Sequence, residues 1–155
     1  MLSQAFRSTP LNSAPVKIPE LGLELTVRLP AEALSGAMTV METVNTPGFG
    51  PPLHRHREAE VFRVMEGSYL YEVDGSRFQA QMGDVVCVPG GAAHAFLNVS
   101  DKPSRQLVMM LPAMDAERFF LELAAVLASS HSDRTALNAF GAPWSVEFLG
   151  PPLTR

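Results

Sequence analysis

The stretch GFGPPLHRHREAEVFRVMEG, residues 48–67, decides how this chain is interpreted. It places His54 and His56 one residue apart at the entrance of an apolar run, although the chain has only 4 histidines. Side chains two residues apart on a strand share a face, so these two imidazoles converge while Arg55 points to the opposite face. Glu60 begins the next strand and joins them. The alternative is a solvated turn between two strands.

A second set of residues lies further along the chain, in GDVVCVPGGAAHAFLN at 83–98. It brings His94 onto a strand whose neighbour on the same face is Phe96. Each histidine alone would be assigned to the surface or to a satisfied core position. Together with a carboxylate they predict a divalent metal site formed by His54, His56, Glu60 and His94. Nitrogen and oxygen ligands that leave coordination positions open suit Fe, Mn, Ni or Co better than a closed structural zinc.

The composition of the chain excludes several classes of protein. The 155 residues, 46% of them hydrophobic and 18% charged, are typical of one packed domain. A net charge of -4 gives no electrostatic footprint for nucleic acid, and no apolar run approaches the roughly 18 residues of a membrane helix. Cys87 is the single cysteine, so disulfides and thiolate zinc sites are excluded. Within the run VVCVP it is expected to be a small core residue. No signal peptide is visible, and a cytoplasmic location is expected.

Short apolar or alternating segments follow one another at regular spacing, with Gly, Pro or Asp between them. This pattern predicts an antiparallel sandwich or barrel, with a hairpin turn at Asp74-Gly75. The expected strands are 23–29, 37–44, 60–67, 69–73, 77–81, 84–89, 94–99 and 104–111.

The pattern changes after residue 112. Apolar residues at helical spacing predict a helix over 114–128 with Asp115 as its N-cap, and a second short helix over 132–140. The fourth histidine, His131, is expected in a solvated loop between them. The expected organisation is an arm at 1–20, a β-barrel at 21–112 and a helical extension with a tail at 113–155.

Aromatic side chains are the candidate walls of a substrate pocket. Phe62 shares a face with Glu60, and Tyr69 and Tyr71 share a face on the following strand. With Phe96 they form the candidate pocket, although core packing is the alternative for each.

The spacing of the two motifs resembles that of a known family. Residues 48–67 read G-x5-H-x-H-x3-E-x6-G, and residues 83–98 read G-x5-P-x-G-x2-H-x3-N. Both resemble the two motifs of the cupin superfamily, in particular its small single-domain members. The resemblance implies an all-β double-stranded β-helix, or jelly-roll, with one or two C-terminal helices in this chain. It also implies one divalent metal per chain (Fe, Mn, Ni, Co or Zn) at the four ligands, while Pro89 and Asn98 are expected to be structural.

Within that family, residues 48–67 most resemble quercetin (flavonol) dioxygenase-like cupins. The resemblance implies a metal-dependent oxygenase acting on a small enolic or phenolic substrate, with Glu60 either remaining a ligand or acting as the base. A metal-dependent isomerase, lyase or cyclase and a non-catalytic cupin that binds a small ligand are the alternatives. The edge strands of such a sheet need cover, so a homodimer is expected, with the arm and the strand at 23–29 pairing with a partner.

Overall fold

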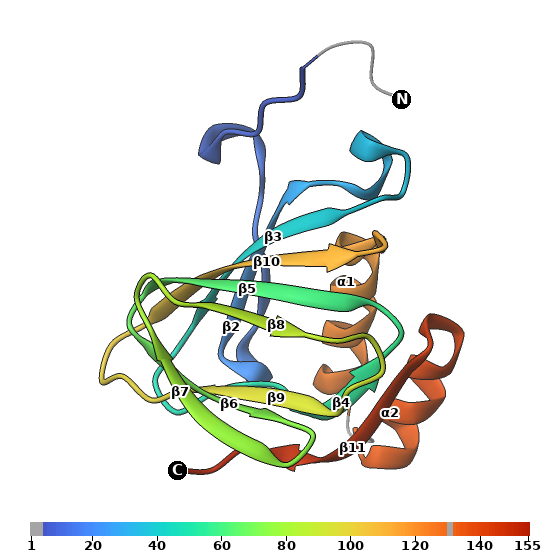
Figure 1. The fold of residues 1–155 in the computed structure, drawn as a ribbon. Helices are drawn as coiled ribbons and strands as arrows, with labels where there is room; N and C mark the ends of the chain where they lie inside the picture. Colours follow the sequence, from blue (N-terminus) through green and yellow to red (C-terminus); the bar gives the residue numbers. More distant parts are fainter. Residues whose placement is uncertain (1–4, 130–131) are drawn as a thin grey trace.

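The computed structural model, which describes residues 5–129 and 132–155, contains two antiparallel sheets facing each other (Figure 1). The six-stranded sheet has the order β1 (Val16–Ile18), β2 (Leu23–Leu29), β3 (Thr39–Asn45), β10 (Ser104–Leu111), β5 (Ala59–Glu66), β8 (Val85–Val88). The five-stranded sheet has the order β11 (Val146–Pro152), β4 (Pro52–His56), β9 (His94–Asn98), β6 (Ser68–Val73), β7 (Ser76–Gln81). The expected all-β jelly-roll is confirmed.

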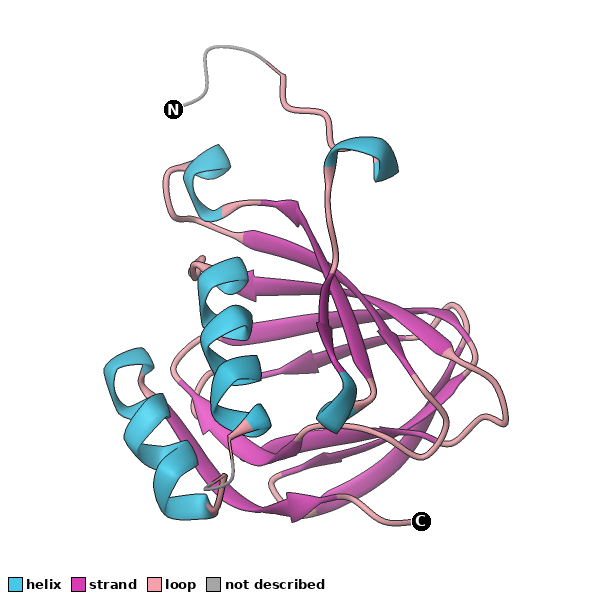
Figure 2. Ribbon diagram, turned by 180° about the vertical axis from the view of Figure 1, so that it is seen from behind, coloured by secondary structure: helices cyan, strands magenta, loops and turns pink. Residues whose placement is uncertain are grey.

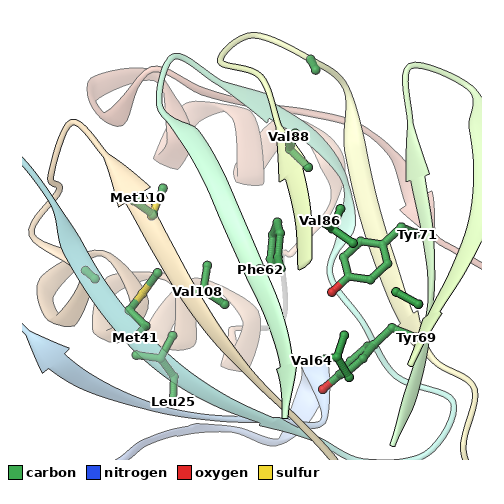
Figure 3. Packing of buried hydrophobic residues seen from close by; sticks show 13 residues of the cluster. Leu25, Met41, Phe62, Val64, Tyr69, Tyr71, Val86, Val88, Val108 and Met110 are labelled. Atoms are coloured by element: carbon green, nitrogen blue, oxygen red, sulfur yellow. The ribbon is translucent and has the colours of Figure 1, made fainter. Parts of the chain in front are cut away.

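Strict alternation of side chains builds the interior between the sheets. Along β3 and β10 every second residue is buried, so each strand presents one face to the opposite sheet, with Met41, Val108 and Met110 as its apolar members. Figure 3 shows Met41, Phe62 and Val108 on the six-stranded sheet facing this interior, with Tyr69 and Tyr71 on the other side. Fully burying a side chain such as Phe62 contributes roughly 1.5–3 kcal/mol. The apolar faces therefore fix the register of the strands.

The turns between strands use residues that tolerate a positive φ. Asp74 and Gly75 connect β6 to β7 at φ 47° and 81°, which confirms the expected hairpin turn. Gly67, between β5 and β6, has φ 78°, and a Cβ there would lie 2.0 Å from Ser104 Oγ. A larger residue at position 67 would thus face both backbone strain and a collision.

Both expected helices are present and begin slightly later than expected. Helix α1 (Ala116–Ala128) is capped by Asp115, which accepts from the backbone N–H of Arg118, and α2 (Arg134–Gly141) is capped by Asp133. Helix α1 buries Phe119 and contacts β1 and β2, as the view from behind shows (Figure 2). Four short 3-10 helices complete the described elements: η1 (Pro10–Asn12), η2 (Pro19–Leu21), η3 (Ala31–Leu34) and η4 (Ala142–Trp144). His131 lies outside the described residues. Within the described ranges, neither α-helix has the length and apolar character needed to cross a bilayer.

Two segments outside the expected strands also pair with the sheets. Residues 16–18, expected to lie in the arm, form β1 and pair with β2, because Val16 and Ile18 both point inward and Ile18 is fully buried. At the other end, the tail forms β11 beside β4. These two ends and the helices share a second apolar cluster, here called the end cluster: Val16, Ile18, Leu21, Phe119, Leu123, Leu137, Val146 and Phe148.

Cys87 is exposed, so the expectation that it is a core residue is wrong. It lies on β8, where Val86 and Val88 take the inward positions and the residue between them must face outward. Because all residues of the run VVCVP are apolar, the sequence does not show which of them face inward and which face outward.

Candidate metal centre

Two neighbouring strands of the five-stranded sheet supply three imidazoles. Strand β4 carries His54 and His56 on one face, and β9 places His94 directly opposite His54 in the ladder. The ring centroids of His54 and His94 lie 4.4 Å apart, and those of His56 and His94 lie 5.0 Å apart. Arg55 points away and pairs with Glu147 of β11 at 2.8 Å. The convergence expected from residue spacing is thus present.

Glu60 reaches the imidazoles from the other sheet. It lies near the start of β5, and its Oε2 is 2.7 Å from His94 Nε2 and 3.5 Å from His56 Nε2. The four donor atoms, one from each residue, all lie within 4.8 Å of one another. Three imidazoles and one carboxylate therefore surround a single point between the sheets.

Each imidazole is held in one tautomer by the backbone. The Nδ1 atoms of His54, His56 and His94 lie 2.7, 3.1 and 2.9 Å from the carbonyl oxygens of Pro52, Glu58 and Ala92. A carbonyl oxygen can only accept, so Nδ1 carries the hydrogen in all three rings. In the neutral ring this leaves Nε2 with a free lone pair, which is the state that binds a metal.

Glu58 is a buried acid that the sequence analysis missed. Its side chain is 4% exposed, and Oε2 lies 3.4 Å from His56 Nδ1 while Oε1 accepts from Arg57 Nε at 2.9 Å. This carboxylate orients His56 from behind. Nothing in the sequence indicates it, because a glutamate that follows an arginine in a turn between two strands is usually solvated.

The protonation of the cluster follows from burial and proximity. Burial, with a smaller contribution from the neighbouring His94, lowers the pKa of His54 to about 3. Burial alone would raise the pKa of Glu60, but hydrogen bonds with His56 and His94 hold it well below its usual range. Burial alone would lower the pKa of His56, yet its hydrogen bond with Glu60 raises it. One carboxylate thus carries its charge among the imidazoles.

The donor set fits a divalent metal. Two donors on opposite sides of an ion, each at ~2.1 Å from it, lie roughly 4.2 Å apart. The four donor atoms, all within 4.8 Å of one another, therefore need only small side-chain movements to bind one ion. Four protein ligands of this kind suit a first-row transition metal and leave coordination positions for other oxygens. His54, His56, Glu60 and His94 would hold the ion.

An apolar cavity adjoins this centre. His54, His56 and Glu60 lie on its wall, and most other lining side chains are apolar, including residues from β3, β10, α1 and β11. Phe62 and Phe96 line it, as expected for pocket residues. Tyr69 and Tyr71 do not: they are 0% and 1% exposed and pack behind Phe96, with ring centroids 5.6 and 6.0 Å from its ring. The two tyrosines were expected to face the pocket. They do not line it, because their hydroxyls donate to Asn45 and Gln106 across the interior.

A jelly-roll with three histidines and one glutamate converging inside it defines a class of metal-binding β-barrels. Residues 41–110 match the family model described as Cupin domain. Among curated proteins, gentisate 1,2 dioxygenase 1 of Aquipseudomonas alcaligenes is 43% identical over 58 residues. That match covers 37% of this chain and 17% of the relative.

Solved structures share the fold. An RmlC-like cupin from Shewanella frigidimarina has a TM-score of 0.63 at 19% identity, covering 74% of this chain and 96% of that one. A predicted oxalate decarboxylase from Thermotoga maritima has a TM-score of 0.64 at 20% identity, covering 69% and 99%. These likenesses establish the architecture.

Proposed function

We propose that this cupin is a metal-dependent oxygenase, a dioxygenase-like oxidoreductase, acting on a small enolic or phenolic substrate. The observation that carries the proposal is a cluster of three imidazoles and one carboxylate, of which His54, His56 and Glu60 lie on the wall of an apolar cavity. When bound, a divalent metal would supply the Lewis acid that lowers the pKa of a substrate hydroxyl and the means of activating dioxygen. The local similarity to a gentisate dioxygenase supports the same reaction class.

The cavity favours a substrate with one ionisable oxygen and an apolar body. Of the described residues that line it, Glu60 alone carries a carboxylate, and none is lysine or arginine. A dicarboxylate would bring two charges into a site with no cationic side chain beside it, which is unfavourable in an apolar environment. An enol or phenol brings one charge at most. The same apolar wall excludes water from the reacting atoms.

Glu60 is the group that accepts the substrate's proton. Its lowered pKa favours the ionised form, and its Oε2 is one of the four donor atoms, 2.7 Å from His94 Nε2, which supports contact with a hydroxyl bound there. The packed positions of Phe62 and Phe96 orient a flat substrate against the cavity wall. The backbone carbonyls on Nδ1 keep the imidazoles fixed while this occurs.

The test compares oxygen consumption by metal-loaded wild type, Glu60→Gln and a surface control, Glu147→Gln, over flavonols, catechols and β-diketones. We expect Glu60→Gln to retain much of its metal and lose turnover by on the order of 10²-fold or more, because an amide cannot accept the proton. The surface variant should match wild type. Equal rates in wild type and Glu60→Gln would remove Glu60 from the reaction. No oxygen uptake with any substrate and metal, together with anaerobic substrate loss, would instead support an isomerase, lyase or cyclase.

A further inference from the structure

Three rows of side chains cross the inner face of the six-stranded sheet. The register pairs Glu60 with Met110, Phe62 with Val108, and Val64 with Gln106. On the next strand, Met41 pairs with Val108 and Thr43 pairs with Gln106. The row that contains Thr43 and Gln106 is therefore separated from Glu60 by four residues of strand, or ~13 Å at about 3.3 Å per residue. An apolar row of Met41, Val108 and Phe62 lies between them (Figure 3).

The far row carries buried polar atoms without partners. Gln106 is fully buried, and Tyr71 donates its hydroxyl hydrogen to Gln106 Oε1. The amide Nε2 of Gln106 and the hydroxyl of Thr43, which is 4% exposed, have no hydrogen-bond partner among the described residues. An unpaired buried donor is unfavourable and calls for an explanation.

In the next row along the same strands, which contains Asn45 and Ser104, the buried polar side chains do have hydrogen-bond partners. Asn45 Oδ1 accepts from the hydroxyl of Tyr69 at 3.0 Å, and Asn98 Oδ1 accepts from the hydroxyl of Ser104 at 2.8 Å. Asn98 Nδ2 donates to the backbone oxygen of Asn45 at 2.9 Å. Among the inward-facing side chains of these rows, the unpaired atoms are those of Thr43 and Gln106; a third buried unpaired atom, Arg105 Nε, belongs to the other face of β10.

Thr43 lines the same cavity as the metal centre. Its side chain and those of His54, His56 and Glu60 border one continuous space, with Phe62 and Phe96 between the two ends. A ligand that extends through this space from the metal centre passes the side chain of Thr43. Gln106 is the cross-strand neighbour of Thr43 and lies directly behind this part of the cavity wall.

We propose that Thr43 Oγ1 and Gln106 Nε2 form a second recognition site, which binds a neutral oxygen of the substrate remote from its metal-binding oxygen. Both atoms can donate to one hydroxyl, carbonyl or ether oxygen, and a hydroxyl can also donate back to Thr43. The substrate is therefore an elongated apolar enol or phenol with a polar oxygen at its far end. This inference rests on the proposed function, because it takes the metal-binding end of the substrate from it.

The experiment measures binding without turnover. Zinc-loaded protein is titrated anaerobically with 3-hydroxyflavone and with 3,4′-dihydroxyflavone, which differ by one hydroxyl at the end remote from the chelating oxygens. Wild type should bind the second compound roughly 2- to 13-fold more tightly, the range expected for one hydrogen bond. Thr43→Val and Gln106→Met should each bring this ratio of affinities toward one. The control Thr26→Val, on the opposite face of β2, should keep the wild-type ratio.

Each other outcome overturns the inference in a distinguishable way. A ratio near one in wild type, or a wild-type ratio in both variants, removes the second site and leaves the proposed function intact. A lower melting temperature in the variants with an unchanged ratio assigns the row to a structural water. Failure of either flavonol to bind the metal-loaded protein refutes the proposed substrate class and this inference with it. If Gln106→Met does not fold, the Thr43→Val result decides, since valine has nearly the shape of threonine.

Discussion

Asn98 is expected to stabilise the barrel more than any single surface contact. It is fully buried, and its amide makes four hydrogen bonds: Nδ2 donates to the carbonyl oxygens of Asn45 and Lys102, and Oδ1 accepts from Ser100 N and Ser104 Oγ. Replacing Asn98 with alanine leaves two interior partners unpaired at about 1–3 kcal/mol each, and two half-buried partners that water can reach at about 0.5 kcal/mol each. The expected loss is therefore about 3–7 kcal/mol of unfolding free energy.

Urea unfolding of the metal-free protein in EDTA measures this loss directly, without a contribution from the ion near His94. Asn138→Ala is the matched control, because Asn138 is half-buried and makes two hydrogen bonds, both to the backbone of Phe148. It should lose about 1–2 kcal/mol. Asn98→Asp should lose at least as much as Asn98→Ala, since a carboxylate cannot donate to two carbonyl oxygens. If Asn98→Ala loses no more than Asn138→Ala, the reasoning is refuted.

Other predictions concern the metal and the assembly. Elemental analysis of protein purified without chelator should find one divalent metal per chain, and His56→Ala should abolish both the metal and activity; wild type without metal after reconstitution would contradict the site. Metal at 1,000 times its dissociation constant should add about 4.1 kcal/mol and raise the melting temperature by roughly 8–16 °C, whereas an unchanged melting curve would argue against binding to the folded state. Apparent metal affinity should rise with pH up to the raised pKa of His56, because this imidazole must lose a proton before it can bind the metal, and calorimetry in two buffers counts the protons released. Light scattering should give a homodimer, and a mass of 16.8 kDa at all concentrations would exclude one.

The sequence predicted the parts of the fold that alternation and spacing encode. Residues 104–111 form β10 with the expected bounds, because every second side chain there is buried, and Val108 and Met110 give it the apolar pattern of a strand. His54 and His56 converge since both lie on one extended strand, and Asp74-Gly75 forms the expected turn because both positions require a positive φ. These features depend on neighbours within a few residues.

Features that depend on distant partners could not be predicted in this way. Strand β1 has only three residues, and its pairing with β2 and packing against α1 are not visible locally. Cys87 faces outward because of the register of β8, which a run of apolar residues does not reveal. Thr43 and Gln106 are 63 positions apart and meet only through the ladder between β3 and β10. Glu58 is buried by the turn that carries it.

The metal donors and the end cluster, which forms part of the cavity wall, come from two different parts of the chain, and the sequences of these parts can change independently. The four metal donors all fall within residues 41–110, the part that matches the family, whereas Leu21, Phe119 and Phe148 reach the cavity from outside it. Substitutions in these outer segments can reshape what enters without altering any donor. Related proteins that keep the same four donors can therefore diverge in substrate through their flanking segments, and a fragment limited to 41–110 would keep the donors while opening the centre to water.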